Sequence, residues 1–308
     1  MTDAAAVIAF RGVLATMLAC PRCRAELSVA DDCPSCGAKF GNDGGTPVLI
    51  ADDNVRQVSF EFRAENSLVD EVELLKIFRF PPRVADPRTL PYHVSPEHAE
   101  LMRGVPAGAT VLEIGCGGGQ SRAWFAALGH RYIGTDISKT RVFEWLRTHG
   151  GPDVVCDTHF LPFRDESFDI VYCAAVFEHL ACPVLAAQEV LRVLKPGGKF
   201  LGNASFLEPW HDHSFFHLTP LGAVELLRAA GFRPIYVWPS RGYTGFQAIL
   251  GTFGSGIFRA VGSLLAWLYD RQTLIRNALK RRMGKDLRAE SLYRGDVAGA
   301  IDWIAEKP

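Results

Sequence analysis

A short apolar segment runs directly into a turn with four glycines, and this junction constrains the fold more than any other part of the sequence. Residues 109–114 read Ala-Thr-Val-Leu-Glu-Ile, a β-branched, apolar run that predicts a strand. Gly115-Cys116-Gly117-Gly118-Gly119 follows at once, and residues 120–128 have the pattern of a helix that Gly129 can end. Because glycine leaves the backbone bare, a strand, glycine turn and helix in this order predict a nucleotide-type binding corner.

Two acids near the turn narrow the ligand class. Asp136 ends a second predicted strand, residues 131–136, at a distance from the turn that suits a ribose diol. Gln120 stands where a dinucleotide fingerprint would have its last glycine, so a dinucleotide is disfavoured. Glu113 lies just before the glycines, where a carboxylate would attract the ammonium of an amino-acid tail and repel a pyrophosphate.

Five motifs, taken in order, resemble those of class I S-adenosylmethionine-dependent methyltransferases. They are residues 113–119, Asp136, Asp157 with residues 161–171, Glu178-His179, and Leu191-Arg192-Val193-Leu194-Lys195-Pro196-Gly197-Gly198. The resemblance covers about residues 106–232 and continues more loosely to the C-terminus. It implies an α/β fold with a seven-stranded, mostly parallel, Rossmann-like sheet, helices on both faces and one antiparallel strand near the end.

The same resemblance implies S-adenosylmethionine as the cofactor and assigns residues to each part of it. The methionine part falls to Glu113, Gly115, Cys116, Gly117 and Gly119, and the ribose to Asp136 with Ile137 beside it. The adenine edge falls to Asp157 and Thr158, and the floor below the sulfonium to Cys173 and Ala174.

Four of the eight cysteines form two C-x-x-C pairs with nine residues between them: Cys20, Cys23, Cys33 and Cys36. Two such turns can present four thiolates in a tetrahedron, which suits a structural Zn²⁺ better than a redox pair. Residues 18–23, 33–37 and 45–50 resemble a small zinc-ribbon family that includes a methyltransferase activator subunit. A more distant resemblance is to the zinc module of bacterial ribosomal-RNA guanine methyltransferases, which has a histidine where this chain has Cys36.

These signals divide the chain into three parts. Residues 1–52 are the expected zinc ribbon with an N-terminal helix, and residues 53–105 are a proline-rich connector with one helix near residues 69–80. Residues 106–308 are the expected methyltransferase domain. Its sixth and seventh strands are expected at residues 234–238 and 300–304, which leaves a helical insert at about residues 242–296 between them.

The insert combines apolar side chains at helical spacing with a basic run from Arg276 to Arg288. One interpretation is a cap packed over the acceptor pocket, with a solvated basic end. The other is a peripheral membrane contact, because residues 245–269 carry one charge, Arg259, and end near Trp267 and Tyr269. The amphipathic pattern favours the cap.

Three of the nine histidines lie within seven residues, after a predicted fifth strand at residues 199–204: His211, His213 and His217. A helix that Thr219 caps and Pro220 starts is expected next. The resemblance places this connection beside the methyl acceptor, so a histidine could act as the base for a hydroxyl, with His179 as a further candidate. A structural role and a metal site remain open alternatives for these histidines.

We weigh three functions of different classes. The favoured one is O-methylation of a small, hydrophobic, hydroxyl-bearing molecule. The second is methylation of ribosomal or transfer RNA gripped by the zinc ribbon, although a net charge of -1 makes nucleic acid the weaker partner, and residues 173–176 lack an Asn-Pro-Pro-Tyr-type motif for base amino groups. The third is a non-catalytic cofactor-binding adapter, against which the glycine turn and Asp136 argue.

Composition and the N-terminus favour a cytoplasmic globular protein. Hydrophobic residues make up 48% of the 308 positions, and acids and bases nearly balance. The apolar residues 7–19 precede Cys20 as in a lipoprotein signal, but Asp3 and Arg11 do not fit such a segment. The cysteines are therefore expected to be reduced thiols.

Overall fold

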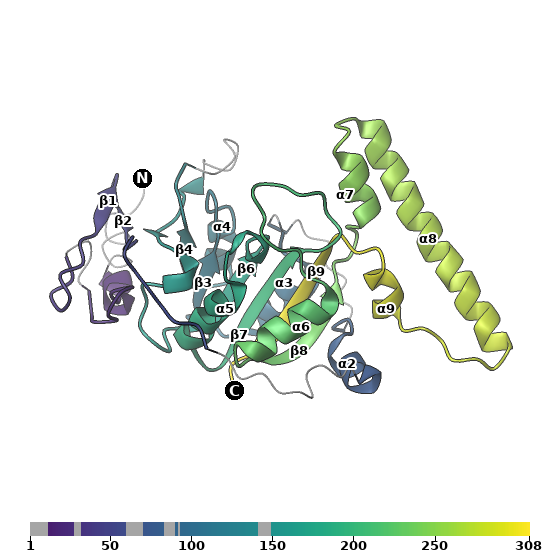
Figure 1. Ribbon diagram of the computed structural model, residues 1–308, viewed down its shortest axis with the longest axis horizontal. Helices are drawn as coiled ribbons and strands as arrows, with labels where there is room; N and C mark the ends of the chain where they lie inside the picture. Colours follow the sequence, from purple (N-terminus) through teal and green to yellow (C-terminus); the bar gives the residue numbers. More distant parts are fainter. Residues whose placement is uncertain (1–11, 28–31, 60–69, 83–89, 92, 141–148) are drawn as a thin grey trace.

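A mixed sheet crosses the whole molecule in the order β1-β2-β5-β4-β3-β6-β7-β9-β8 (Figure 1). The computed structural model describes residues 12–27, 32–59, 70–82, 90–91, 93–140 and 149–308. Within them the strands are β1 Gly41–Asp43, β2 Thr46–Val48, β3 Thr110–Ile114, β4 Arg131–Asp136, β5 Val154–Val155, β6 Phe168–Ala174, β7 Leu194–Ser205, β8 Arg233–Pro239 and β9 Ala300–Glu306.

The expected seven strands run from β5 to β8 in this sheet, but the expected count is wrong, because the described residues form nine. Strands β3 to β7 pair in parallel, and β9 is antiparallel to both β7 and β8. The β1–β2 hairpin adds two strands at the β5 edge, where Val48 pairs in parallel with Val155. A bond from the Leu49 amide to the Val155 carbonyl, 2.8 Å long, continues this pairing. The cysteine-rich module therefore extends the sheet.

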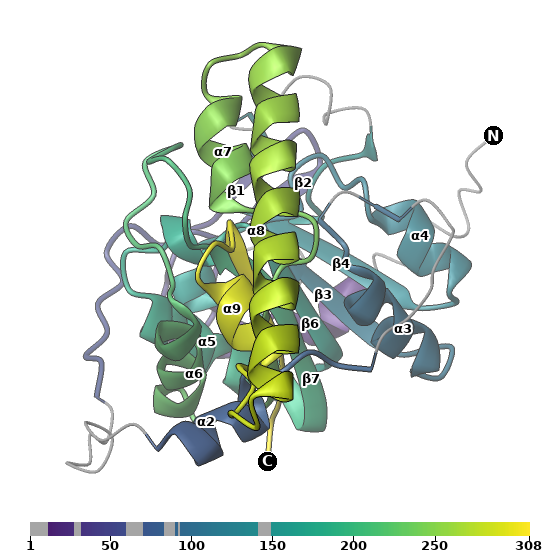
Figure 2. The same ribbon diagram turned by 90° about the vertical axis from the view of Figure 1, so that its right-hand side faces the viewer.

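Helices cover both faces of the sheet, as expected (Figure 2). The labelled helices of the chain are α2 Glu71–Ile77, α3 Pro96–Gly104, α4 Arg122–Ala127, α5 Pro183–Val193, α6 Pro220–Ala229, α7 Gly245–Gly251, α8 Gly256–Arg282 and α9 Glu290–Gly295, with short 3-10 turns η3 Thr158–Phe160 and η4 Phe177–His179. Side chains alternate along the strands, so Val111 packs with α3 and α4 while Leu112 packs with α5 and α6.

The connector, residues 53–105, contains two helices, whereas the sequence predicted one. Helix α2 begins after Asp70, whose carboxylate accepts from the Val72 and Glu73 amides. Pro96 starts α3, and Ser95 caps it by accepting from the His98 amide at 3.1 Å. Proline is well suited to the first helical turn, so Pro96, which we expected to interrupt a helix, begins one instead. The N-terminal helix is described only over residues 12–17, since residues 1–11 lie outside the described part.

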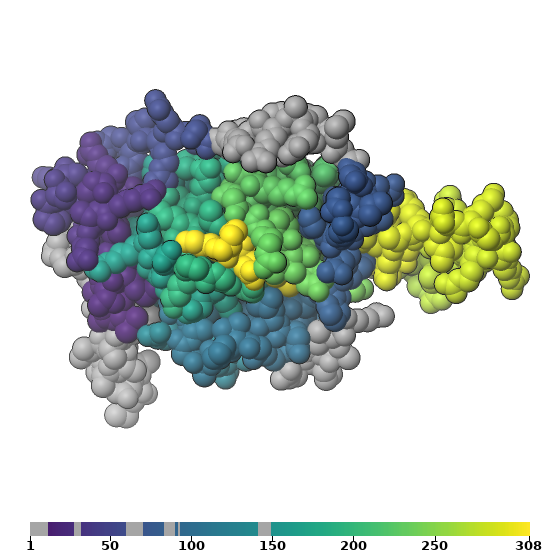
Figure 3. All heavy atoms as spheres, turned by 90° about the horizontal axis from the view of Figure 1, so that it is seen from below, coloured from purple at the N-terminus to yellow at the C-terminus, as the bar shows by residue number. Residues whose placement is uncertain are grey.

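The insert forms a helical hairpin, α7 and α8, that projects from the body of the molecule (Figure 1, Figure 3). The two helices cross closely at Gly262, where an added Cβ would lie 2.9 Å from the Gln247 Cα. Gly262 is the one buried residue of α8, so the expected cap over the acceptor pocket is wrong. Among the described residues, no helix is both long and apolar enough to cross a membrane.

Candidate functional site

The predicted ligand-binding residues meet where the strand order reverses. Strands β4 and β5 lie on one side of β3, and β6 and β7 lie on the other. Connections that leave neighbouring parallel strands in opposite directions open a crevice at the carboxyl ends of those strands. The glycine turn follows β3, Asp136 ends β4, and Ala174 ends β6. The structure thus brings these three motifs together at the carboxyl ends of the parallel strands.

The glycine turn has a backbone that other residues would strain. Gly115, Gly117 and Gly119 have φ values of 69°, 54° and 81°. A Cβ on Gly115 would lie 2.1 Å from Val176 Cγ2, so the segment after β6 packs directly against the turn. Cys116 between these glycines is buried, and its amide donates to the Thr135 carbonyl at 2.9 Å. The turn is therefore held between β4 and the loop that carries η4.

Asp136 is tied to the turn across the strand ends. Its Oδ2 accepts from the Gly117 amide at 3.0 Å, and its Oδ1 accepts from the Ser138 amide at 3.2 Å. Burial raises the pKa of Asp136 above its usual value, against the lowering effect of these amide donors. Ile137 follows and exposes its side chain. The carboxylate and the apolar side chain next to it therefore lie beside the glycine turn.

Glu113 points into the protein. Its Oε1 accepts from Ser121 Oγ at 3.0 Å, and its Oε2 accepts from the Tyr132 hydroxyl. Burial raises the pKa of Glu113 to about 7, although both hydroxyl donors act in the opposite direction. The side chain expected to attract an ammonium group therefore already has a partner on each oxygen.

Asp157 and Thr158 begin the 3-10 turn η3 after β5. Asp157 Oδ1 accepts from the His159 amide at 2.9 Å and lies 2.6 Å from His159 Nδ1. Burial raises the pKa of Asp157, but the hydrogen bonds and charge of His159 outweigh burial and leave it below its usual value. Sequence reasoning missed His159, whose position two residues after an aspartate is typical of a local side-chain turn.

Cys173 and Ala174 lie beside the turn, as the sheet register shows. Cys173 pairs with Ile114, the residue before Gly115, and is fully buried. Ala175 follows with φ 54°, and its amide donates to Asn203 Oδ1 at 2.8 Å. Asn203, on β7, was not identified from the sequence, since a lone asparagine within an apolar strand gives no clear signal.

Three of the four candidate histidines gather after β6 and β7. The rings of His179 and His211 have centroids 5.4 Å apart, and those of His211 and His217 are 5.8 Å apart. Phe215 donates its amide to the Glu178 carbonyl at 2.6 Å, which fixes the loop after β7 on η4. His213 lies outside this group: it is exposed, with its ring 5.9 Å from that of Trp210.

The four N-terminal cysteines also converge. Cys20 Sγ lies 3.7 Å from Cys36 Sγ, and Cys23 Sγ lies 3.5 Å from Cys33 Sγ, with all four sulfurs within 4.8 Å of one another. Four thiolates around Zn²⁺ at about 2.3 Å would have their sulfurs roughly 3.8 Å apart. The two turns share one backbone form, with the amides of Arg24 and Gly37 donating to Cys20 and Cys33 carbonyls. The donor set and its spacing fit a zinc ion.

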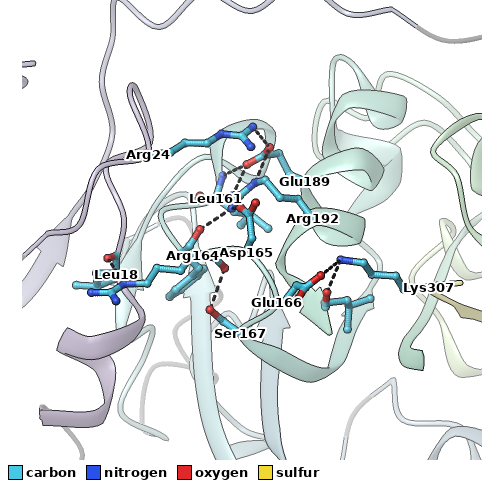
Figure 4. Close-up of polar contacts among 12 residues, drawn as sticks. Leu18, Arg24, Leu161, Arg164, Asp165, Glu166, Ser167, Glu189, Arg192 and Lys307 are labelled. Atoms are coloured by element: carbon cyan, nitrogen blue, oxygen red, sulfur yellow. Dashed lines mark hydrogen bonds and ion pairs between the residues drawn. The ribbon is translucent and has the colours of Figure 1, made fainter. Parts of the chain in front are cut away.

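A buried carboxylate joins this cysteine module to the main domain (Figure 4). Glu189, on α5, is 2% exposed and accepts from Arg24 Nη2 at 2.9 Å and Arg56 Nη1 at 2.5 Å. Arg192 Nη2 donates to the same carboxylate at 2.7 Å and to the Leu161 carbonyl at 2.9 Å. Sequence reasoning missed Glu189, because a glutamate in a helix most often faces solvent.

Comparison with known proteins places the central residues in one family. Residues 112–202 match the family described as a methyltransferase domain. An uncharacterized methyltransferase of Mycobacterium avium is 31% identical over 171 residues, covering 52% of this chain and 61% of that protein. The 2-methyl-6-phytyl-1,4-hydroquinone methyltransferase of Synechocystis is 39% identical over 100 residues, covering 30% of this chain and 31% of that protein.

Solved structures are similar at a lower level of identity. The phosphoethanolamine N-methyltransferase 2 of Haemonchus contortus is 22% identical, with a TM-score of 0.44 over 68% of this chain and 52% of that chain. The alignments with the two curated relatives cover less than two thirds of those proteins' own length.

Proposed function

We propose that the chain contains an S-adenosylmethionine-dependent methyltransferase domain and that it methylates a hydroxyl group of a small, hydrophobic acceptor. The observation that carries the proposal is the contact between the two halves of the site. Val176 packs against Gly115, so the loop leading to the histidine group adjoins the turn expected to hold the methyl donor. The expected donor and acceptor sides therefore share one crevice.

The donor side uses the residues at the carboxyl ends of β3 to β6. Asp136 and the amides of the glycine turn would hold the ribose and the methionine part, and Asp157 with Thr158 would meet the adenine. When bound, S-adenosylmethionine supplies a methyl group on a positively charged sulfur, which is already a strong electrophile. The protein therefore has to align the acceptor, exclude water and take up a proton.

The acceptor side combines apolar surface with imidazole side chains. Trp210, Phe215 and Phe216 are exposed on the loop after β7, beside His211 and His217. A hydroxyl needs a base to become a nucleophile, and histidine can serve near neutral pH without perturbation. The Synechocystis relative is named for a hydroquinone that carries a phytyl chain, which agrees with an apolar, hydroxyl-bearing acceptor.

The cysteine module has a structural part in this proposal. Cys20, Cys23, Cys33 and Cys36 would hold one Zn²⁺ and keep the β1–β2 hairpin folded against β5. Without the ion, a module of this size has too small a core to stay folded.

The test is a methyl-transfer assay with tritiated S-adenosylmethionine on cell extract, separated into RNA, protein and organic-soluble pools. Label in the organic pool, reduced in His217→Ala and retained in His213→Ala, supports the proposal. His213 is the matched control because it lies in the same loop but outside the histidine group. Label that appears only in RNA would overturn the acceptor class and favour the RNA alternative.

A further inference from the structure

A carboxylate and two imidazoles converge on the acceptor side of the crevice. Glu178 and His179 belong to η4, and His211 belongs to the loop after β7. Their possible ligand atoms all lie within 4.8 Å of one another. The set has the composition of a two-histidine, one-carboxylate site, which binds divalent transition metals with coordination positions left open.

The hydrogen bonds leave the ligand atoms of this set available. Glu178 Oε1 accepts from Ser205 Oγ at 2.7 Å, whereas its Oε2 is buried and has no hydrogen-bond partner among the described residues. His211 Nδ1 lies 2.9 Å from the Pro209 carbonyl and must donate to it, which leaves a lone pair on Nε2. Metal-binding histidines commonly donate their other N–H to a carbonyl in this way. His179 Nδ1 is likewise buried without a partner.

The charge around the set lacks a balancing cation. Glu178 is fully buried, and no Lys or Arg forms an ion pair with it among the described residues. A second carboxylate lies close to the set, with Glu208 Oε2 3.9 Å from His211 Nδ1. A buried, unpaired carboxylate is costly unless a proton or a metal ion neutralises it.

We propose that Glu178, His179 and His211 bind one divalent transition metal, such as Mn²⁺ or Fe²⁺, that activates the acceptor hydroxyl. This inference rests on the proposed function for its chemistry, but the binding site does not. The acceptor oxygen would occupy an open coordination position and lose its proton to His217 Nε2. His217 Nδ1 donates to the Phe206 carbonyl at 3.1 Å, so its Nε2 is an acceptor, and the acceptor hydroxyl would replace Ser214 Oγ, which now lies 3.3 Å from Nε2.

Methyl transfer then balances as follows. An oxygen lone pair forms the new bond to the methyl carbon, the carbon–sulfur bond breaks, and its electron pair stays on sulfur. The products are the methyl ether, neutral S-adenosylhomocysteine and one proton on His217. The metal holds the oxygen throughout and undergoes no change of oxidation state.

The binding test adds Mn²⁺ to the whole chain with its zinc in place. Binding is measured as the loss of the free-ion signal of Mn²⁺ in electron paramagnetic resonance. Wild type is expected to bind one Mn²⁺, and Glu178→Gln and His211→Ala each to lower the affinity about tenfold or more. His213→Ala, in the same loop, should bind as wild type does. Equal Mn²⁺ binding by wild type and His211→Ala, or no binding by wild type, overturns the site.

A second readout separates this inference from the proposed function. S-adenosylmethionine binding by calorimetry should be unchanged in His211→Ala, because that residue lies on the acceptor side. Full methyl transfer by metal-free enzyme would overturn the metal proposal and leave the methyltransferase proposal standing. Mn²⁺ binding with no methyl transfer to any pool would overturn the methyltransferase proposal and leave the metal site standing.

A different observation, the inverted polarity of α8, carries a second inference. A stripe of apolar side chains at spacings of three, four and seven residues faces solvent: Ile257, Val261, Leu264, Leu268, Ile275 and Leu279. The side toward the protein carries small or polar residues, namely Gly262, Ala266, Thr273 and Asn277. The small and polar side chains of α8 thus face the protein, and no described residue covers its apolar stripe.

Charge indicates which partner fits. Helix α8 has six Lys or Arg and one acid, Asp270, which pairs with Arg294 at 3.2 Å. Trp267 lies at the middle of the helix with the Arg271 guanidinium 5.4 Å from its ring. Apolar side chains flanked by cations and an interfacial tryptophan are the features by which helices lie in an anionic lipid surface. A second copy of α8 would instead bring two strongly basic helices together.

The geometry points to α8 as a monotopic contact with an anionic bilayer, its apolar stripe immersed at the headgroup level. The hairpin starts beside the acceptor loop, because a Cβ on Gly245 would lie 2.8 Å from Leu207 Cβ. An apolar acceptor held in the bilayer would thus be delivered next to the site. This consequence rests on the proposed function, whereas lipid binding itself does not.

Vesicle co-sedimentation tests this contact with the full chain. Wild type should sediment with phosphatidylglycerol vesicles, less at high salt, and stay in solution with phosphatidylcholine vesicles. Leu268→Glu should lower the bound fraction at least about fivefold. The matched control is Leu274→Glu, which makes the same change about 120° round the helix from Leu268 and should bind nearly as wild type does.

Two outcomes would overturn the lipid contact. One is the absence of wild-type binding to phosphatidylglycerol vesicles. The other is equal binding by Leu268→Glu. A dimer in light scattering that Leu268→Glu dissociates, without vesicle binding, would assign the stripe to a second copy.

Discussion

Arg24 and Glu189 stand 165 positions apart in the sequence, yet Arg24 Nη2 lies 2.9 Å from Glu189 Oε1. The pair joins a residue of the first cysteine turn to the middle of α5. Arg56 and Arg192 share the same buried carboxylate, so one acid holds the cysteine module, the connector and the main domain together.

Replacing Glu189 should therefore destabilise the whole chain. Glu189→Gln keeps the shape but leaves the buried Arg192 with no anionic partner on α5, and we expect a loss of about 3 kcal/mol in the free energy of unfolding in urea. Glu225→Gln, which weakens the more exposed pair with Arg228 at 3.1 Å, should change stability by less than about 1 kcal/mol. Equal effects of the two variants would contradict the proposed role of the network.

Asp136→Ala should weaken S-adenosylmethionine binding by roughly thirtyfold, or about 2 kcal/mol, because it removes charge-assisted hydrogen bonds. Isothermal titration calorimetry measures the dissociation constant directly. Asp212→Ala, on the exposed part of the acceptor loop, is the control and should bind the donor normally. Undiminished binding by Asp136→Ala would remove this residue from the site.

Gly115→Ala should lower both stability and donor binding, since its Cβ would lie 2.1 Å from Val176 Cγ2 in a left-handed backbone. Gly108→Ala has a similar backbone, φ 87°, but nothing within 4 Å, so it isolates the backbone strain of about 1–2 kcal/mol. Adding Val176→Ala to Gly115→Ala should recover the part of the stability loss that comes from the clash between the new Cβ and Val176. Thermal unfolding of the three variants measures these contributions.

Purified protein should contain one zinc per chain by elemental analysis. Cys33→Ser should lose the metal and lower the melting temperature, because the sulfur is part of the proposed tetrahedron. Cys182→Ser, outside that group, should retain it. A zinc content near zero in well-folded wild type would remove zinc from the module.

Stability without ligand should depend on pH through Glu113. Burial raises the pKa of Glu113 from 4.5 to about 7 in the folded chain, so the native state binds this proton more tightly than the unfolded state. Its contribution to stability is therefore lost as pH rises from about 4.5 to about 7 and is level above that. Relative to Glu113→Gln, wild type should lose about 2 kcal/mol of unfolding free energy between pH 5 and pH 8. A constant difference would show that Glu113 ionises normally.

The sequence predicted the parts of the fold that depend on local patterns. Apolar runs located β3, β8 and β9 to within a few residues, and Thr219-Pro220 located the start of α6. Long-range pairing gave no such signal. The two extra strands join the sheet where Val48 and Leu49 meet Val155, and none of these residues indicates its partner in the sequence.

The candidate site shows the same division. The spacing along the chain correctly predicted that Asp136 lies beside the glycine turn, because the residue that ends a strand can be located from the sequence. The spacing did not predict that His211 and His217 join the histidine group while His213 does not. The directions of these side chains depend on the loop backbone, in which Asp212 and His213 have positive φ values of 41° and 58°. The spacing also placed α8 over the pocket, whereas the close crossing at Gly262 directs the helix outward.

The β1–β2 hairpin has a consequence for solubility. Without it, the short strand β5 would be an open edge of the sheet, with unpaired amides and carbonyls available to another chain. The cysteine module closes that edge through Val48 and Leu49. Loss of the proposed zinc ion would thus expose a template for strand addition, and self-association would begin at β5 before the proposed methyl-transfer site unfolds.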